Sequence, residues 1–436
     1  MTWTITMSRR SLLICFACLA LSPLARADEL PRAEADASGF SKEKLEAIPA
    51  AIKKAVEEKK VAGGSALIAK KGKVVHLSTV GMQDIDAKAP IKESTIYRIA
   101  SMSKPITSVA VMILVEEGKI KTTDPLSKYV PEFKEMKVIV PGKDGKEFTT
   151  VAANREITIH DLLTHSSGIT YGLLNKPILS KIYADAGIID GLAETKIKIG
   201  DNIKKLAKLP LCCQPGSAWE YGLNTDVLGY VVEVASGKTL DEFLHERIFK
   251  PLKMNDTHFV LPKDKRARLA SVYQPGPDKT ISKLEKPFVQ GTMNVSVNYP
   301  VDDESKHYSG GAGLVSTIGD YFRFSQMMLN KGELNGARVL KAETVETMTK
   351  NQLGDIRIMF PGFDLMGYGF GILSEKAKET NKDPAGVGSF SWGGAFGTFF
   401  WIDPKNELVC VLMVQAFPPD FAMGNEFKKL VYDAMK

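Results

Sequence analysis

The amino-acid sequence predicts a mixed α/β (α+β) fold in which both ends of the chain build one antiparallel sheet. Near the N-terminus, two short apolar segments flank the turn Lys71-Gly72, a pattern typical of a β-hairpin. Four further short apolar segments, broken by Gly or by Asp-Pro-Lys-Asn, lie between residues 367 and 415. The sequence between these two blocks has mainly helical periodicity. We therefore expect helices to flank the sheet and a mostly helical lobe to be inserted between its two halves.

Each element is predicted from its own local pattern. Residues 41–59 repeat Leu45, Ile48 and Ile52 at helical spacing, and Ser41 is suited to cap that helix. Thr158 is suited in the same way to cap the helix that follows it. The other predicted helices cover 103–119, 224–238, 240–253, 317–332, 341–350 and 421–436. The predicted strands cover 65–72, 73–81, 367–375, 388–394, 397–404 and 407–415, and long loops are expected near 171–200 and 275–312.

The N-terminus has the pattern of a secretory signal. A short basic segment with Arg9 and Arg10 precedes an apolar run too short to cross a bilayer, and Ala25-Arg26-Ala27 resembles a cleavage site. The pair Arg9-Arg10 also suits a twin-arginine signal, so the Sec and twin-arginine routes both stay open. We expect residues 1–27 to be a signal peptide and the protein to be exported, periplasmic or secreted. Residues 28–436 are then one domain, with a sheet lobe at about 40–95 and 340–436 and a helical lobe at about 96–339.

Composition excludes several classes of protein. Apolar residues make up 44% of the chain and charged residues 25%, which is ordinary for a globular protein. Loss of the signal removes three arginines and lowers the net charge of +6 by three, too little and too scattered for a nucleic-acid partner. The sequence contains no run of 18 or more apolar residues, so it predicts no membrane span. We expect a monomer that acts on a small molecule.

Cysteine and histidine usage gives no sign of a metal site. No spacing of these residues resembles zinc ligands, so no metal and no cofactor are expected. The mature chain keeps Cys212, Cys213 and Cys410. Adjacent cysteines rarely bridge to each other, and a bridge from Cys410 to one of the pair stays open.

Ser101 and Lys104 lie three residues apart where a loop leads into an apolar helix, IYRIASMSKPITSVAVMILV. A serine hydroxyl needs a neighbouring base to act as a nucleophile near neutral pH. Residues three apart share one helix face, and burial favours the neutral form of an amine, so Lys104 can serve as that base. The spacing alone is weak evidence, because Ser41 and Lys44 repeat it in a charged surface segment.

Four further stretches give this pair its context. They are LLTHSSGITYG at 162–172, PGSAWEYGLNTDVLGYVVE at 215–233, SGGAGLVSTIGDYFRF at 309–324 and SWGGAFGTFFWIDP at 391–404. In this order they resemble the class C β-lactamase-like serine hydrolases, over about residues 40–430. That superfamily includes class C β-lactamases, certain DD-peptidases and the family VIII carboxylesterases.

The resemblance assigns roles to individual residues. It implies that Ser101 forms a covalent acyl-enzyme, that Lys104 is its partner and that Tyr221 shuttles protons. Whether Lys104 or Tyr221 first takes the serine proton stays open, since the two titrate as a coupled pair. Tyr97 and Tyr171 are rival tyrosines: Tyr97 lies too near Ser101 in an extended segment, and Tyr171 suits the wall of the cleft.

The family's Lys-Thr-Gly-like triplet corresponds to Trp392-Gly393-Gly394. The resemblance implies an oxyanion hole made by the backbone N–H groups of Ser101 and Ala395, with small residues that let a substrate approach the backbone. A β-bulge is a simpler reason for the glycines and is compatible with this role.

Two departures from the family pattern bear on the substrate. Trp392 stands where β-lactamases have a cation that holds the substrate carboxylate, and an indole offers an apolar wall instead. Leu223 stands where the family's Y-x-N motif has its amide, and Asn224 follows one place later. By the resemblance, a tryptophan in that triplet is a feature of the family VIII esterases. Both changes favour an esterase that acts on short acyl esters through Ser101, with β-lactam hydrolysis as a secondary activity.

Several alternatives compete with this interpretation. A class C-type β-lactamase would use the same groups, and a peptidase acting on D-amino-acid peptides of the cell wall would need a cationic grip from Lys306 or Arg323. An inactive penicillin-binding-like scaffold is disfavoured because Ser101, Lys104 and Tyr221 are all present. A Ser-His-Asp hydrolase is disfavoured because the chain has no G-x-S-x-G elbow, and His160 and His165 are expected to be structural.

Overall fold

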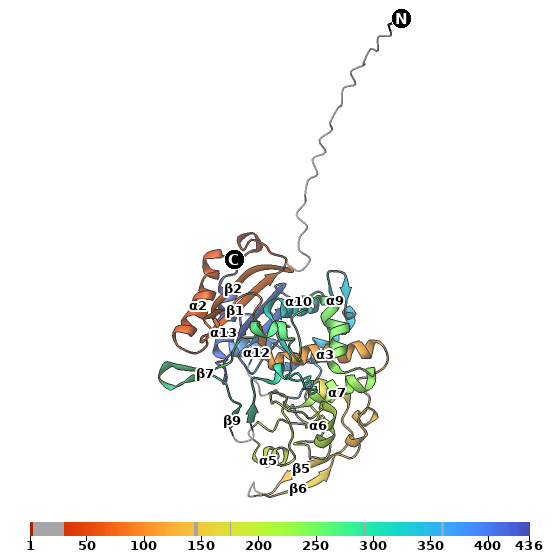
Figure 1. Ribbon diagram of the computed structural model, residues 1–436. Helices are drawn as coiled ribbons and strands as arrows, with labels where there is room; N and C mark the ends of the chain where they lie inside the picture. Colours follow the sequence, from red (N-terminus) through yellow and green to blue (C-terminus); the bar gives the residue numbers. More distant parts are fainter. Residues whose placement is uncertain (3–29, 144–146, 175, 291–292, 359–361) are drawn as a thin grey trace. The chain divides into compact units, whose positions relative to one another are not determined.

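The computed structural model describes residues 1–2, 30–143, 147–174, 176–290, 293–358 and 362–436 (Figure 1). Its contacts divide the chain into Met1–Leu30 and Pro31–Lys436. The predicted signal peptide therefore lies almost entirely outside the described residues and stays a prediction. Within the described part of the chain, no helix is both long and apolar enough to span a bilayer.

The main element of Pro31–Lys436 is an eight-stranded sheet in the order β14-β15-β16-β17-β18-β1-β2-β3. All of its neighbouring strands pair antiparallel. Its N-terminal strands are β1 (Gly63–Lys70), β2 (Lys73–Asp84) and β3 (Ala89–Pro90). Its C-terminal strands are β14 (Leu365–Met366), β15 (Gly371–Ile372), β16 (Phe390–Gly393), β17 (Phe399–Asp403) and β18 (Leu408–Val414). The predicted sheet from both chain ends is confirmed, with β1 joined directly to β18.

Helices cover both faces of this sheet. Strand β18 is buried along its whole length, as expected for a central strand packed on both sides. On one face, Ile52 of α2 (Ala47–Glu57) and Phe427 of α13 (Ala422–Asp433) pack against Leu412 in one apolar cluster. On the other face, Tyr321 of α10 (Ile318–Leu329) lies edge-on to Phe400 at 4.9 Å between ring centroids. Neighbouring residues of β17 and β18 thus point into different layers, as the period of two requires.

The predicted helices are present, mostly shortened at their ends. Residues 41–59 form two helices, and Ser41 caps the first by accepting a hydrogen bond from the N–H of Lys44. Thr158 and Asp161 form a complete capping box. The remaining α-helices are α1 (Lys42–Leu45), α3 (Ser103–Glu116), α4 (Ile159–Leu163), α5 (Pro177–Asp185), α6 (Ile199–Leu206), α7 (Asn224–Ser236), α8 (Leu240–Leu244), α9 (Lys250–Leu252), α11 (Ala342–Met348) and α12 (Glu375–Asn381).

The two predicted long loops contain regular structure. Helix α5 lies within 171–200, and the region 275–312 holds strands that pair locally. The additional strands are β4 (Ile96–Arg98), β5 (Lys137–Pro141), β6 (Phe148–Ala152), β7 (Tyr273–Gly276), β8 (Thr280–Lys283), β9 (Phe288–Gln290), β10 (Met293–Val295), β11 (Val315–Thr317), β12 (Glu333–Leu334) and β13 (Ala337–Arg338). Most of them span two to four residues, too few for an alternating pattern to stand out.

All three described cysteines are free thiols. Cys410 is completely buried in β18, opposite Ile68 and Trp401 of the flanking strands. Cys212 and Cys213 lie next to each other, with their Sγ atoms 3.7 Å apart. The structure therefore contains no bridge between Cys410 and this pair.

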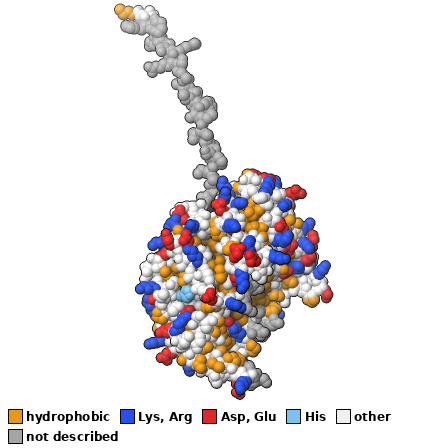
Figure 2. Space-filling model, turned by 180° about the vertical axis from the view of Figure 1, so that it is seen from behind, with side chains coloured by type: hydrophobic (Ala, Val, Ile, Leu, Met, Phe, Trp, Pro, Cys, Tyr) orange, Lys and Arg blue, Asp and Glu red, His pale blue; other side chains and the backbone are white. Residues whose placement is uncertain are grey.

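On the face shown in Figure 2, basic and acidic side chains are interspersed, as expected from the small net charge.

Candidate active site

Ser101 lies in a single 3₁₀ turn, Ala100–Met102, between strand β4 and helix α3. The residue before it, Ala100, has a φ of 42°, a strained conformation for a residue other than glycine. Such strain is common where a fold holds a functional side chain in place. The turn is anchored because the N–H of Ile99 donates to the carbonyl oxygen of Leu314, at 3.1 Å.

Lys104 lies in the first turn of α3 and is 1% exposed. Its Nζ donates to Ser101 Oγ at 3.2 Å, to the Tyr171 hydroxyl at 3.0 Å and to the carbonyl oxygen of Gly311 at 2.8 Å. Ser101 and Lys104 therefore lie within hydrogen-bond distance of each other, as their spacing in the sequence predicts. The amine also lies over the Tyr221 ring, 4.7 Å from its centre.

Tyr221 completes a hydrogen-bonded chain of three side chains. Its hydroxyl donates to Ser101 Oγ at 2.8 Å, although 120 residues separate the two. Gly222 lets the Tyr221 segment lie against the preceding loop, because a Cβ there would be 2.2 Å from the carbonyl oxygen of Ile169. The rival Tyr97 points elsewhere: it is completely buried and its hydroxyl pairs with Ser65 at 2.7 Å.

The end of strand β16 closes the site from the sheet. A Cβ on Gly394 would lie 2.4 Å from the carbonyl oxygen of Ile99, so glycine allows β16 to approach the backbone just before Ser101. Ala395 follows and packs with Ala100 in one apolar cluster. The structure thus brings the segments of Ser101 and Ala395 together, and their role as an oxyanion hole stays a prediction.

Aromatic rings surround Tyr221. Trp392 is 3% exposed and its ring centre lies 5.8 Å from that of Tyr221. Phe363 lies 5.2 Å from Trp392, and Trp219 stacks on Tyr221 at 6.0 Å. The wall next to the nucleophile is therefore built from aromatic side chains, as the tryptophan in the triplet suggested.

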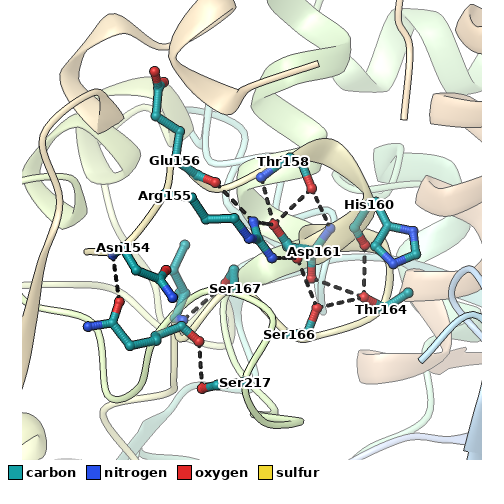
Figure 3. Close-up of polar contacts among 12 residues, drawn as sticks. Asn154, Arg155, Glu156, Thr158, His160, Asp161, Thr164, Ser166, Ser167 and Ser217 are labelled. Carbon is teal, nitrogen blue, oxygen red and sulfur yellow. Dashed lines mark hydrogen bonds and ion pairs between the residues drawn. The ribbon is translucent and has the colours of Figure 1, made fainter. Parts of the chain in front are cut away.

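The loop between α4 and Tyr171 is held by a carboxylate at the start of α4. Asp161 receives two hydrogen bonds from Arg155, at 2.6 and 2.9 Å, and further bonds from Thr158 and Ser166 (Figure 3). The side chain of Asp161 is 2% exposed and that of Arg155 is 43% exposed, so the carboxylate is buried beneath a guanidinium that reaches the surface. Arg155 and the Thr158 bonds hold the pKa of Asp161 below its usual value despite burial.

Leu223 and Asn224 lie behind Tyr221 and are both completely buried. The Asn224 amide receives a hydrogen bond from Ser167 and donates to the carbonyl oxygens of Ile169 and Glu220. The Asn224 side chain therefore links the loop of Ser167 and Ile169 to the segment of Glu220 by hydrogen bonds. Direct contact of either residue with a substrate would need the Tyr221 segment to move.

The two histidines near the site have structural contacts. His165 is completely shielded: its ring stacks on Trp392 at 6.2 Å with an interplanar angle of 8°, and its Nδ1 pairs with Asn224. Burial and the charge of Lys104 hold the pKa of His165 well below its usual value, so the ring is neutral near neutral pH. His160 pairs with the Tyr368 hydroxyl at 2.9 Å. Among the described residues, no group of three or more His, Cys, Asp or Glu is arranged to hold a metal ion.

Comparison with known proteins gives the family. A family model described as beta-lactamase matches residues 48–433. The chain belongs to the beta-lactamase family. It is 32% identical to an uncharacterised protein of Mycobacterium tuberculosis, over 86% of this chain and 90% of that one. It is 30% identical to esterase EstB of Burkholderia gladioli, over 84% of this chain and 89% of that one.

A solved structure shares this fold. EstCE1, described as a hydrolase with promiscuous acyltransferase activity, superposes with a TM-score of 0.76 at 24% identity, covering 90% of this chain and 99% of that one. Family membership, together with the Ser101 geometry, identifies the protein as a serine hydrolase. The predicted resemblance, fold class and enzyme class are thereby confirmed.

The sequence did not assign two partners of Lys104. Tyr171 was expected in the cleft wall, yet its hydroxyl lies 3.0 Å from the amine. The Gly311 carbonyl comes from the stretch SGGAGLV, which was singled out without a role for any of its residues. The run of small residues in this stretch is the sequence feature that could have indicated a close contact made by its backbone.

Proposed function

We propose that the protein hydrolyses carboxylic esters with short acyl chains through an acyl-enzyme on Ser101. The observation that carries this proposal is the chain from Tyr221 to Ser101 to Lys104, set against the aromatic wall of Trp392. The names of two relatives support it: esterase EstB, and lovastatin esterase of Penicillium rubens at 29% identity.

The reaction has two steps. Ser101 Oγ bonds to the ester carbonyl carbon while its proton passes to Lys104 or Tyr221, which are both within hydrogen-bond distance. The bond from carbon to the alcohol oxygen then breaks, and the alcohol leaves with that proton. Water then bonds to the acyl carbon and passes a proton to the same base. The bond from that carbon to Ser101 Oγ breaks, the acid leaves and the base returns the proton to Ser101 Oγ. In both steps, the N–H groups of Ser101 and Ala395 would stabilise the negative carbonyl oxygen.

A β-lactam is the second substrate class, because the same groups would open its ring. Trp392 provides no ion pair for a lactam carboxylate, so we expect esters to be preferred. A peptidase acting on D-amino-acid peptides gains no support from the cations considered for it. Lys306 is exposed near Asp241, and Arg323 is buried on α10 near Asp320.

Transfer of the acyl group to an alcohol is a further candidate. One relative is named monacolin J acid methylbutanoyltransferase, from Aspergillus terreus, and is 25% identical over 78% of this chain. An alcohol can replace water in the second step without any additional group. Hydrolysis in the presence of a primary alcohol, with the new ester measured by chromatography, tests this branch.

The experiment that tests the main proposal compares three forms of residues 28–436: the wild type, Ser101→Ala and Ser41→Ala. Ser41 has the same spacing to a lysine but caps a surface helix, so it is the matched control. A short-chain p-nitrophenyl ester and a chromogenic cephalosporin are the substrates. We expect fast ester turnover and slow lactam turnover, both abolished in Ser101→Ala and retained in Ser41→Ala. Ester turnover that persists in Ser101→Ala contradicts the mechanism, and dominant lactam turnover makes the protein a β-lactamase.

We also propose that the protein is exported after cleavage near Ala27 and that it is a monomer. The signal-like sequence at residues 1–27 supports export. N-terminal sequencing of the protein from the native host, with cell fractionation, checks the first statement, and light scattering of the purified protein checks the second.

A further inference from the structure

We infer that Asp226 is a positioning residue that sets the charge of Lys104. Asp226 lies in the first turn of α7 and is 1% exposed. This inference rests on the proposed Ser101 chemistry and extends it to a residue that does not touch the nucleophile.

The backbone of residues 309–311 links Asp226 to Lys104. The hydroxyl of Ser309 donates to Asp226 Oδ1, and the N–H of Gly311 donates to the same oxygen at 3.4 Å. The carbonyl oxygen of Gly311 accepts the 2.8 Å hydrogen bond from Lys104. One residue therefore contacts the carboxylate with its N–H and the amine with its carbonyl group, which fixes the two charges relative to each other.

The glycines of this segment are needed for that arrangement. A Cβ on Gly311 would lie 2.4 Å from Asp226 Oδ2, and a Cβ on Gly310 would lie 2.7 Å from the carbonyl oxygen of Thr225. A Cβ essentially never lies this close to another heavy atom, so a larger residue at either position would force the segment or its neighbours to shift. The small residues of Ser309-Gly310-Gly311 therefore allow this backbone segment to contact both the Asp226 carboxylate and the Lys104 amine.

Electrostatics favours Lys104 as the partner of Asp226. The titratable groups that face Asp226 are Lys104, His307, Asp190 and Tyr171. Burial lowers the pKa of His307 and raises that of Tyr171, which leaves both neutral near neutral pH. Burial and then the charge of Asp226 raise the pKa of Asp190 to about 7, so its carboxyl group is neutral or negative and supplies no positive charge. Of these four, Lys104 supplies the positive charge.

One oxygen of Asp226 is left for this electrostatic role. Oδ2 is buried and has no hydrogen-bond partner among the described residues. A buried carboxylate oxygen without a hydrogen bond is costly unless an opposite charge lies near. Burial raises the pKa of Asp226 above its usual value, although Ser309 and then Lys104 lower it in part. Because Gly311 bonds to both side chains, an ionised Asp226 is the counter-charge of the Lys104 ammonium group.

Neutralising Asp226 should therefore shift the pH profile of activity in a definite direction. In Asp226→Asn, the ammonium form of Lys104 loses its counter-charge and gives up its proton at a lower pH. If Lys104 acts as a neutral base, the acid limb of the kcat/KM profile moves to lower pH. If Lys104 must be charged while Tyr221 takes the proton, the alkaline limb moves to lower pH. A neighbouring opposite charge shifts a pKa by about one unit or more.

The experiment measures pH profiles of ester hydrolysis for the wild type, Asp226→Asn, Ser309→Ala and Asp320→Asn. Asp320 is the matched control, a buried carboxylate of α10 that bonds to Asp256 and Thr257. Thermal melting confirms that each variant is folded. We expect one limb to move down by about one pH unit in Asp226→Asn, less in Ser309→Ala, and not at all in Asp320→Asn.

The outcomes separate this inference from the proposed function. A downward shift of either limb supports the inference, and the limb that moves shows which group is the base. Unmoved limbs in both Asp226→Asn and Ser309→Ala, or an upward shift, overturn it. If Asp226→Asn does not fold, Ser309→Ala gives the answer alone. Absence of Ser101-dependent hydrolysis in the wild type instead overturns the proposed function.

Discussion

Gly394 and the carbonyl oxygen of Ile99 are so close that a Cβ on Gly394 would lie 2.4 Å from that oxygen. This contact joins the sheet to the turn that presents Ser101. It makes the glycine triplet a feature of packing as well as of substrate approach.

Gly394→Ala is expected to destabilise the protein and to lower activity, because strand β16 or the Ser101 turn must shift. Overpacking of this kind costs about 1 to 3 kcal/mol of unfolding free energy. Gly393→Ala is the matched control, since its Cβ would meet nothing closer than 3.5 Å. Denaturant unfolding and ester kinetics of both variants check this. Equal losses in the two variants would contradict the argument.

Tyr221→Phe is expected to lower kcat by about 10² or more, with a smaller change in KM, because it removes a proton carrier and leaves the ring in place. Tyr97→Phe also removes one hydroxyl, but that hydroxyl pairs with Ser65 away from Ser101. It should keep kcat and lose about 1 kcal/mol of stability. Steady-state kinetics with a short-chain ester checks this. A kcat of Tyr221→Phe within threefold of the wild type would exclude Tyr221 from proton transfer.

The parts of the site within one short segment could be predicted from the sequence. Ser101 and Lys104 share one turn, so their spacing determines their neighbourhood. Thr158 and Asp161 likewise form a local capping box that sequence patterns describe well. The sheet could be predicted because its long strands carry strong apolar runs.

Contacts between distant segments could not be derived in this way. Tyr171 contacts an amine 67 residues away, and Asp226 meets Ser309 across 83 residues. Such contacts depend on how helices pack, which local periodicity does not determine. The strand Met293–Val295 has three residues, too few for a pattern of alternation. Asn224 stands one place after the amide position of the family's motif, and its side chain bonds to Ser167 and His165, 57 and 59 residues away.

The pH dependence of stability should reflect Asp190. Burial raises the pKa of this carboxyl to about 7, well above its usual 3.8, although the N–H groups of Gly172 and Leu173 donate to it. The unfolded chain therefore releases this proton more readily than the folded protein, and stability falls as pH rises from about 4 to 7. Asp190→Asn should lose less stability over this range, by about 1 to 3 kcal/mol. Chemical unfolding of both forms at pH 5 and pH 8 checks this, and parallel losses would contradict it.

Trp392→Lys should change the substrate preference towards β-lactams. Trp392 occupies the position where a cation would hold the lactam carboxylate, and its ring instead lies 5.8 Å from that of Tyr221. A lysine there can pair with a carboxylate, so the ratio of lactam to ester kcat/KM should rise about tenfold, equivalent to about 1.4 kcal/mol. Trp392→Phe is the control, because it keeps an aromatic ring without adding charge and should leave the ratio low. Removal of the indole also costs packing against His165 and Phe363, so both variants should unfold at lower denaturant concentration. The kinetics of both substrates are measured for each variant. A cephalosporin whose carboxylate is blocked as an ester is a third substrate, and comparison with it isolates the effect of charge. A ratio that rises equally in Trp392→Phe would show that space at this position, rather than charge, selects the substrate.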